Sequence, residues 1–171
     1  MTIADDSDAR RPVSAPPGDA LASLMGLMDQ VKDVSRRYYA LTGKPLGVTG
    51  EVAEYEAARL LRLQLSPARE PGYDALTTHS PRVEKLQIKG RAVEPSKRYV
   101  GRVPKIRLEP RFDAALLVLL DRNTMEALEI WRAAYADIKR RLTEPGSKSR
   151  NERLSMGINQ FRSIAQLVWS A

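Results

Sequence analysis

The sequence predicts an α/β sandwich, in which a small central mixed β-sheet is flanked by helices and an extra helix lies at the N-terminus. Two observations carry this prediction. Residues 19–42 repeat apolar side chains at the spacing of an amphipathic helix. Residues 112–120 are apolar on both faces, which is typical of a central strand that is covered on both sides. Helical and strand-like segments therefore belong to one α+β domain, which we place at residues 19–171.

The N-terminal part of the chain divides into an arm and a helix. Residues 1–18 are rich in Ala, Pro, Asp and Ser, so we expect a disordered arm. The helix over residues 19–42 ends at Gly43, with Pro45 beyond it. We interpret its apolar stripe as core packing or as a dimer seam, and a Met-rich partner groove is the alternative. The stripe consists of Leu21, Leu24, Met25, Met28, Val31, Val34 and Tyr38.

A second helix is predicted over residues 49–63, capped by Thr49 or Gly50 and carrying Glu51 where the helix dipole favours an acid. Apolar residues surround much of its circumference, so we expect it to be buried against the sheet. Residues 65–70 and 73–77 are predicted to form the first two strands.

The third strand is predicted over residues 83–91, with Gly90 marking its end. The segment 95–110 that follows is strongly basic and is interrupted by Gly101 and Pro104. We expect it to form a loop or an edge hairpin near the functional face. A charged edge strand that prevents aggregation is the alternative.

The last third of the chain reads as one strand, two helices and a loop. Residues 125–131 pair back onto the apolar strand, and residues 132–142 form a helix with a basic C-terminal end. Residues 144–151 form a flexible polar loop. Residues 158–169 are predicted to form the last helix, with apolar residues on its buried face.

The chain of 171 residues carries a net charge of +7, and the excess is local. Nine basic and two acidic residues fall between positions 82 and 107, a stretch that alone accounts for the whole excess. Clustered cations favour a polyanionic partner, most simply nucleic acid. A solvated basic surface is the alternative reading.

Several function classes are excluded. The chain has no Cys, so it has neither disulfides nor a thiolate metal site, which fits a reducing, cytoplasmic location. Its single histidine, His79, excludes any two-histidine metal site. We find no apolar run of membrane-spanning length, no signal-peptide pattern and no common phosphate-loop, dinucleotide or serine-hydrolase motif.

Candidate functional residues lie on the predicted hairpin of residues 73–77 and 83–91. Gln87 and Lys89 are two apart on a strand and therefore share a face, and a regular strand would add Lys85. Leu86 and Ile88 then point into the core. Asp74 supplies one acid at the start of the hairpin. A lysine and an amide on one face, with an acid nearby, indicate a functional site.

Asp74, a turn and then Gln87-x-Lys89 resemble the signature of the PD-(D/E)xK nuclease superfamily, which has the restriction-endonuclease-like fold. The resemblance covers roughly residues 47–120 and includes Gly50 followed by Glu54 on the preceding helix. Gln87 replaces the commoner acid, as in Mrr-like restriction nucleases. The resemblance implies a metal-dependent endonuclease that hydrolyses DNA phosphodiester bonds, with a role in restriction, defence or repair.

The roles of the site residues are those that the resemblance implies. Asp74 would be the principal ligand of Mg²⁺ or Mn²⁺, with further oxygens from Gln87, the backbone carbonyl of Ile88 and Glu54. Lys89 would orient the attacking water and stabilise charge beside it. The amide in place of an acid lowers the negative charge of the site, so we expect weaker metal binding.

DNA is the expected partner. The phosphate-binding candidates are Lys85, Arg91, Lys97, Arg98, Arg102, Lys105, Lys148 and Arg150. A homodimer and a separate specificity or regulatory protein remain open as further partners. Two other functions also remain open: a non-catalytic nucleic-acid-binding or protein-interaction module with a decayed nuclease site, and a structural subunit assembled through its first helix.

Overall fold

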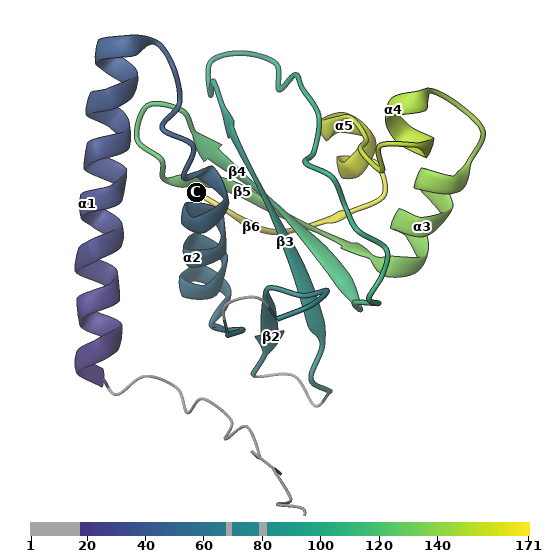
Figure 1. Cartoon of the computed structure of the whole chain (residues 1–171), viewed down its shortest axis with the longest axis horizontal. Helices are drawn as coiled ribbons and strands as arrows, with labels where there is room; N and C mark the ends of the chain where they lie inside the picture. The colour runs from purple at the N-terminus through teal and green to yellow at the C-terminus, as the bar shows by residue number, and fades with distance from the viewer. Residues whose placement is uncertain (1–17, 68–69, 79–81) are drawn as a thin grey trace, which may run out of the picture.

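The computed structural model describes residues 18–67, 70–78 and 82–171. Residues 1–17 of the expected arm (1–18) and the turn at His79 lie outside these ranges, and Gly18 is the first residue of α1. Figure 1 shows one sheet with α1 and α2 on one side and the remaining helices on the other. This arrangement confirms an α/β sandwich. The helices are α1 (Gly18–Thr42), α2 (Thr49–Leu61), α3 (Tyr135–Thr143), α4 (Lys148–Asn151) and α5 (Ile158–Arg162).

Over the described part of the chain the sheet has six strands, and each strand lies beside its neighbour in the sequence. The β3–β4 pair is parallel and every other pair is antiparallel, so the sheet is mixed as predicted. A parallel pair needs a long return connection, which residues 94–113 provide. The strands are β1 (Leu63–Leu65), β2 (Ala75–Thr77), β3 (Lys85–Val93), β4 (Ala114–Asp121), β5 (Ala127–Ala134) and β6 (Gln166–Ser170).

Strand β4 is the central strand that the apolar run predicted, and its residues 114–120 are all buried. Because side chains alternate along a strand, β4 feeds two separate cores. Leu116 and Val118 pack in the cluster that includes α2. Leu117 and Leu119 pack in the cluster that includes α3 and α5.

The basic connection between β3 and β4 is a loop, and the structure builds no edge hairpin from it. Val103 and Ile106 are fully buried, so the loop forms part of the second core. Backbone hydrogen bonds join Val103 N–H to the Met156 carbonyl at 2.8 Å and Ile106 N–H to the Leu154 carbonyl at 2.9 Å. The loop therefore covers one face of the sheet, and it leaves the side chains of Lys97, Arg98, Lys105 and Arg107 exposed.

The second helix is shorter than predicted. Arg62 has a left-handed conformation, with φ of 54°, and its N–H bonds to the Ala58 carbonyl, which ends α2 at Leu61. Strand β1 then begins at once, so the predicted strand over 65–70 was wrong in position.

Gly90 does not end the third strand, which continues to Val93. A Cβ atom on Gly90 would lie 2.6 Å from both Ala53 Cβ and the Thr49 carbonyl oxygen. Glycine is therefore needed here because α2 packs directly onto the backbone of β3. The same contact sets the position of Glu54, one residue after Ala53.

The C-terminal third departs most from the predictions. Strand β5 continues to Ala134, so α3 begins three residues later than expected, and α4 lies inside the predicted loop. The predicted helix over 158–169 was wrong. It is the short helix α5 followed by β6, in which Trp169 lies opposite Ile130 of β5.

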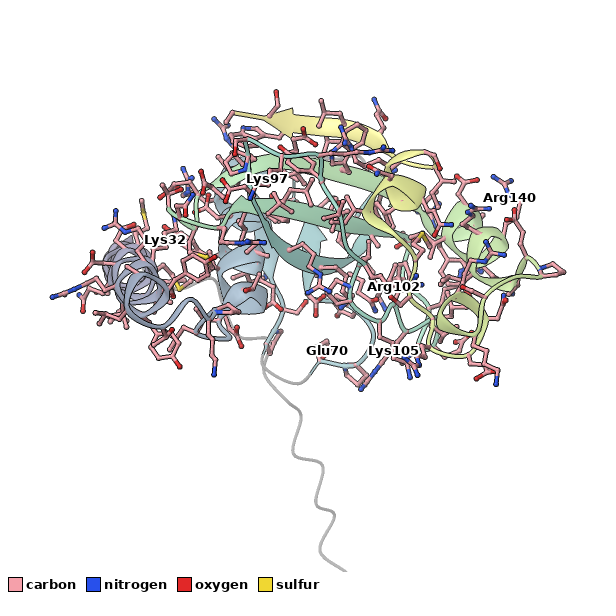
Figure 2. All side chains as sticks on the ribbon, turned by 90° about the horizontal axis from the view of Figure 1, so that it is seen from above. Lys32, Glu70, Lys97, Arg102, Lys105 and Arg140 are labelled. Carbon is pink, nitrogen blue, oxygen red and sulfur yellow. The ribbon has the colours of Figure 1, made fainter. Side chains whose placement is uncertain are left out.

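Helix α1 is attached to the body through a buried ion pair. Lys32 Nζ lies 2.6 Å from Glu56 Oε1 on α2 and 3.0 Å from Glu126 Oε1, and Glu56 is fully buried. Figure 2 shows Lys32 on the side of α1 that faces the body. Burial lowers the pKa of Lys32, but its hydrogen bonds to Glu56 and Glu126 outweigh that effect and raise the pKa overall.

Within the described residues, no helix combines the length and the apolarity needed to cross a bilayer.

Candidate active site

Asp74 directly precedes β2, at the open end of the β2–β3 hairpin. The Asp74 N–H donates to the Leu86 carbonyl at 2.8 Å, and the Asp74 carbonyl accepts from the Ser66 N–H at 2.9 Å. The side chain is fixed as well, since Oδ2 accepts from the backbone N–H of Ile88 at 2.6 Å. The acid therefore lies against β3, at the level of the predicted motif.

Lys89 follows immediately, and its Nζ lies 4.0 Å from Asp74 Oδ2. Both side chains are largely shielded, with 21% of Lys89 and 29% of Asp74 exposed. Burial lowers the pKa of Lys89, and the nearby charge of Arg107 lowers it further, against the opposing charges of Asp74 and Glu54. The site therefore favours the neutral form of the Lys89 amine more strongly than bulk water does.

Glu54 reaches the same place from α2. Burial raises the pKa of its carboxyl group, and the charges of Asp74 and Glu51 raise it further. The charge of Lys89 opposes this rise. Two partly buried carboxylates that repel each other are the environment in which a bound cation is stabilising.

Gln87 is buried, with only 4% of the residue exposed. Its side-chain Nε2 donates weakly to the carbonyls of Gly72 at 3.3 Å and Arg107 at 3.4 Å. Among the described residues, its Oε1 has no hydrogen-bond partner although it is buried. A buried oxygen without a partner is costly, so this atom is suited to accept from water or to bind a cation.

An open groove of about 560 Å³ is lined by Glu54, Ile88 and Lys89 of the site, while Asp74 and Gln87 are not among its lining residues. It follows the β3 edge that faces β2, because β2 pairs with β3 only at Lys85 and Leu86. The Leu86 carbonyl points to this edge, so the two-residue period places the Ile88 carbonyl there too. The groove is lined by Tyr39, Gly43, Pro45, Thr49, Gly50, Glu54, Ile88, Lys89, Gly90, Arg91, Ala92, Pro104 and Arg122.

The donor atoms fit a hard divalent cation. Mg²⁺ and Mn²⁺ prefer oxygen ligands, and Mg²⁺ keeps several waters, so few protein atoms suffice. Asp74 and Glu54 supply the carboxylates, and Gln87 Oε1 is an available neutral oxygen. In the described ranges, no group of three or more His, Cys, Asp or Glu side chains comes together. Any metal here would therefore be held by two carboxylates at most.

The eight basic candidates do not form one patch. In Figure 2, Lys97 lies well apart from Arg102 and Lys105. Lys148 and Arg150 belong to α4, which lies beside α3 and away from α2 in Figure 1. The side chains of Lys97, Arg98, Lys105 and Lys148 are exposed. Lys85 is exposed too, and its Nζ lies 5.0 Å from the centre of the Tyr73 ring.

Three of the basic candidates have structural partners. Arg102 donates to the Ser155 carbonyl and, at 3.2 Å, to Ser155 Oγ, which joins the basic loop to the C-terminal segment. Arg91 Nε donates to the Arg102 carbonyl at 2.5 Å. Arg150 donates to the Pro145 carbonyl at 2.6 Å and closes the turn before α4.

Sequence reasoning missed three residues at this site. Tyr39 and Arg122 line the groove from α1 and from the turn after β4. Arg107 places its carbonyl against Gln87 and its charge near Lys89. Each lies outside the motif segment. Arg107 ends the basic run of residues 82–107, but no local pattern in the sequence marks Tyr39 or Arg122.

No known family model matches this sequence, and no curated protein matches it either.

Proposed function

We propose that this chain is a metal-dependent endonuclease with a restriction-endonuclease-like fold, of the PD-(D/E)xK type, and that it hydrolyses DNA phosphodiester bonds. One observation carries the proposal. Asp74, Lys89 and Glu54 come from a hairpin and the helix before it, and they converge at an open strand edge. The mixed sheet, with α2 packed against the motif strand, supports the same fold.

Asp74 and Glu54 would hold a Mg²⁺ or Mn²⁺ ion, with the Ile88 carbonyl and Gln87 Oε1 as further oxygens. The ion would supply an activated water and neutralise charge on the phosphoryl oxygens. The backbone bond from Ile88 fixes the Asp74 carboxylate before any ligand arrives. Such fixed orientation is favourable, because a positioned group loses little freedom on binding.

Lys89 would accept the proton that the attacking water loses. Its lowered pKa makes a neutral amine accessible, and a neutral amine accepts a proton from the attacking water. In its charged form it offsets the negative charge that grows on the phosphate. Its fixed distance from Asp74 keeps it beside the ion-binding oxygens.

The basic loop and the groove would bind the phosphate backbone. Lys89 and Arg91 line the groove itself, and exposed Lys97 and Lys105 extend along the loop beyond it. Contacts of this kind are independent of sequence and weaken with salt. They would position the duplex, with the scissile phosphate at Asp74.

A non-catalytic DNA-binding module is the second candidate, and Gln87 favours it. An amide stands where a third acid would strengthen the metal site. The variant Gln87→Glu separates the two functions. In a working nuclease it increases metal affinity and activity at low metal concentration. In a decayed site it changes neither.

Cleavage of plasmid, linear duplex and single-stranded DNA, with Mg²⁺ or Mn²⁺, tests the proposal. We expect metal-dependent cleavage of duplex DNA that is lost in Asp74→Ala and in Lys89→Ala. Equal activity in all three proteins would place the activity elsewhere. Salt-sensitive binding without cleavage, unchanged in both variants, would favour the binding module.

A further inference from the structure

The groove beside the site continues along β3, and its lining carries more cations than acids. Lys89, Arg91 and Arg122 line it, and Glu54 is the one acid among the described residues that do so. A hollow lined by an excess of one charge focuses the electric field and attracts ligands of the opposite charge. The part of the groove beyond Lys89 therefore favours an anionic ligand.

The backbone positions of the three cations follow one another at regular steps along the strand. Lys89 and Arg91 are two residues apart on β3. Arg122 comes level with Val93, because its N–H donates to the Val93 carbonyl at 2.8 Å. At about 3.3 Å per residue, the row from position 89 to position 93 is roughly 13 Å long. Each step is comparable with one nucleotide of an extended strand, so the row is suited to successive phosphates.

Arg122 is the cation that most lacks a partner. It is partly buried, and within the described ranges its guanidinium has no hydrogen bond and no ion pair. Arg91 differs, because its Nε donates to the Arg102 carbonyl at 2.5 Å. A charge that is partly withdrawn from water without a partner is unfavourable. A phosphate in the groove would provide that partner, since guanidinium pairs well with phosphate oxygens.

The backbone of β3 adds hydrogen-bonding groups to the same groove. The carbonyls of Lys85 and Val93 accept hydrogen bonds from the chain on the β4 side. Backbone groups alternate in direction along a strand, so those of Gly90 and Ala92 point to the edge that β2 leaves unpaired beyond Leu86. Both residues line the groove. Unpaired N–H and C=O groups at a strand edge can bind the polar edges of bases.

The size and the lining of the groove fit one nucleic-acid strand. Its volume of about 560 Å³ is that of a small-molecule site, which leaves no room for a double helix. Tyr39 of α1 and Pro45 of the α1–α2 connection line it together with Pro104 of the basic loop. A basic groove that carries an aromatic ring is typical of proteins that bind single strands, because the bases stack on the ring.

We propose that the groove holds an unpaired DNA strand that continues from the scissile phosphate, with phosphates at Arg91 and Arg122 and a base on Tyr39. The substrate is then a duplex joined to a single-stranded tail. The inference rests on the proposed nuclease function for the position of the scissile phosphate. Binding of the tail itself requires neither the metal ion nor cleavage.

Anisotropy of fluorescein-labelled DNA tests the groove, in EDTA so that no strand is cut. A blunt duplex is compared with the same duplex extended by an unpaired 5′ or 3′ tail. We expect at least one tail to tighten binding at least about tenfold, since stacking and phosphate contacts both contribute. Arg122→Ala and Tyr39→Leu should lose most of this preference. Arg98→Ala is the matched control, because Arg98 is exposed outside the groove and should affect both DNAs equally.

The salt dependence of binding to a short single-stranded oligonucleotide counts the phosphate contacts. Each contact contributes about 0.7 to the slope of log affinity against log salt concentration. Arg122→Ala should therefore lower the slope by about that amount, and Arg122→Lys should retain it. Thermal unfolding should give Arg122→Ala the Tm of wild type, because the guanidinium has no partner among the described residues.

Equal affinity for blunt and tailed DNA, binding of neither, or a tail preference that survives in Arg122→Ala would overturn the inference. Cleavage of blunt duplex by a protein without any tail preference would remove this inference and leave the nuclease function standing. A tail preference that depends on Arg122, in a protein that cleaves no DNA with Mg²⁺ or Mn²⁺, would support the groove and contradict the nuclease function.

Discussion

The carboxylate of Asp74 is held by the strand that carries the motif: its Oδ2 accepts a hydrogen bond from the Ile88 N–H at 2.6 Å. The next side chain along β3, that of Lys89, lies 4.0 Å from the same oxygen. One backbone contact therefore fixes the acid and brings it beside the lysine. Hydrogen bonds from backbone N–H groups to a carboxylate are short and strong. The predictions below follow from this arrangement and from the elements that support it.

Glu54→Gln should raise stability and weaken metal binding. Burial and the neighbouring carboxylates raise the pKa of Glu54, so the native state binds its proton more tightly than the unfolded state does. Wild type therefore loses stability as pH rises from the ordinary glutamate pKa through the raised one. The neutral variant avoids this loss. Thermal unfolding at neutral pH should show a higher Tm, and affinity for Mn²⁺ should fall roughly 10–100-fold.

The stability gain of Glu54→Gln should shrink as pH falls, because wild-type Glu54 then becomes protonated too. A variant that is less stable than wild type at neutral pH would show that Glu54 has favourable native partners instead of a repulsive site.

Lys89→Ala should reduce cleavage about 10²–10⁴-fold, the usual contribution of a positioned general base. Because the pKa of Lys89 is lowered, the wild-type rate should rise with pH until the amine is neutral. Lys89→Arg should not restore the rate, since arginine stays charged. Rates measured across pH check both points. Recovery in Lys89→Arg would mean that only the positive charge is needed.

Gly90→Ala should destabilise the fold by about 1–3 kcal/mol, a typical cost of overpacking. The added methyl group would meet Ala53 Cβ and the Thr49 carbonyl at 2.6 Å, which pushes α2 away from β3. Chemical denaturation measures the loss. Gly26→Ala in α1 is the control, because a Cβ there has no atom within 4 Å and alanine favours a helix. Equal stability of the Gly90→Ala variant and wild type would contradict the close packing.

Lys32→Met should cost about 3 kcal/mol, because Glu56 would stay buried with Arg59 as its one remaining ion-pair partner among the described residues. In wild type the raised pKa of Lys32 means that the stabilisation is present below the ordinary lysine pKa and is lost as pH rises through the raised value. Urea unfolding of Lys32→Met and of Lys32→Met/Glu56→Leu should show partial recovery in the double variant. A double variant worse than the single one would show that Glu56 has another role.

The central strand and the hairpin of the site were predictable from the sequence because their signals are local. A run that is apolar on both faces identified β4, whose residues 114–120 are buried, and the two-residue period placed Gln87 and Lys89 on one face. The limits of elements depend on contacts between distant residues. Gly90 reads as a strand end by itself, and only the approach of α2 explains why glycine stands inside β3.

The last segment shows the same limit. Its apolar residues fit a helical period, yet residues 166–170 form a strand that pairs with the edge of β5. The groove residues Tyr39 and Arg122 are brought in by α1 and by the turn after β4. No spacing in the sequence links them to Glu54 and Lys89, which line the same groove.

A Mn²⁺ titration followed by electron paramagnetic resonance tests the central claim most directly, since it needs no substrate. Asp113→Asn is a matched control for Asp74→Asn, because Asp113 Oδ2 also accepts from a β3 backbone N–H, that of Lys85 at 2.8 Å. We predict that wild type and Asp113→Asn bind Mn²⁺ at one site and that Asp74→Asn does not. Absence of binding in wild type, or equal binding in Asp74→Asn, would contradict a metal site at this hairpin.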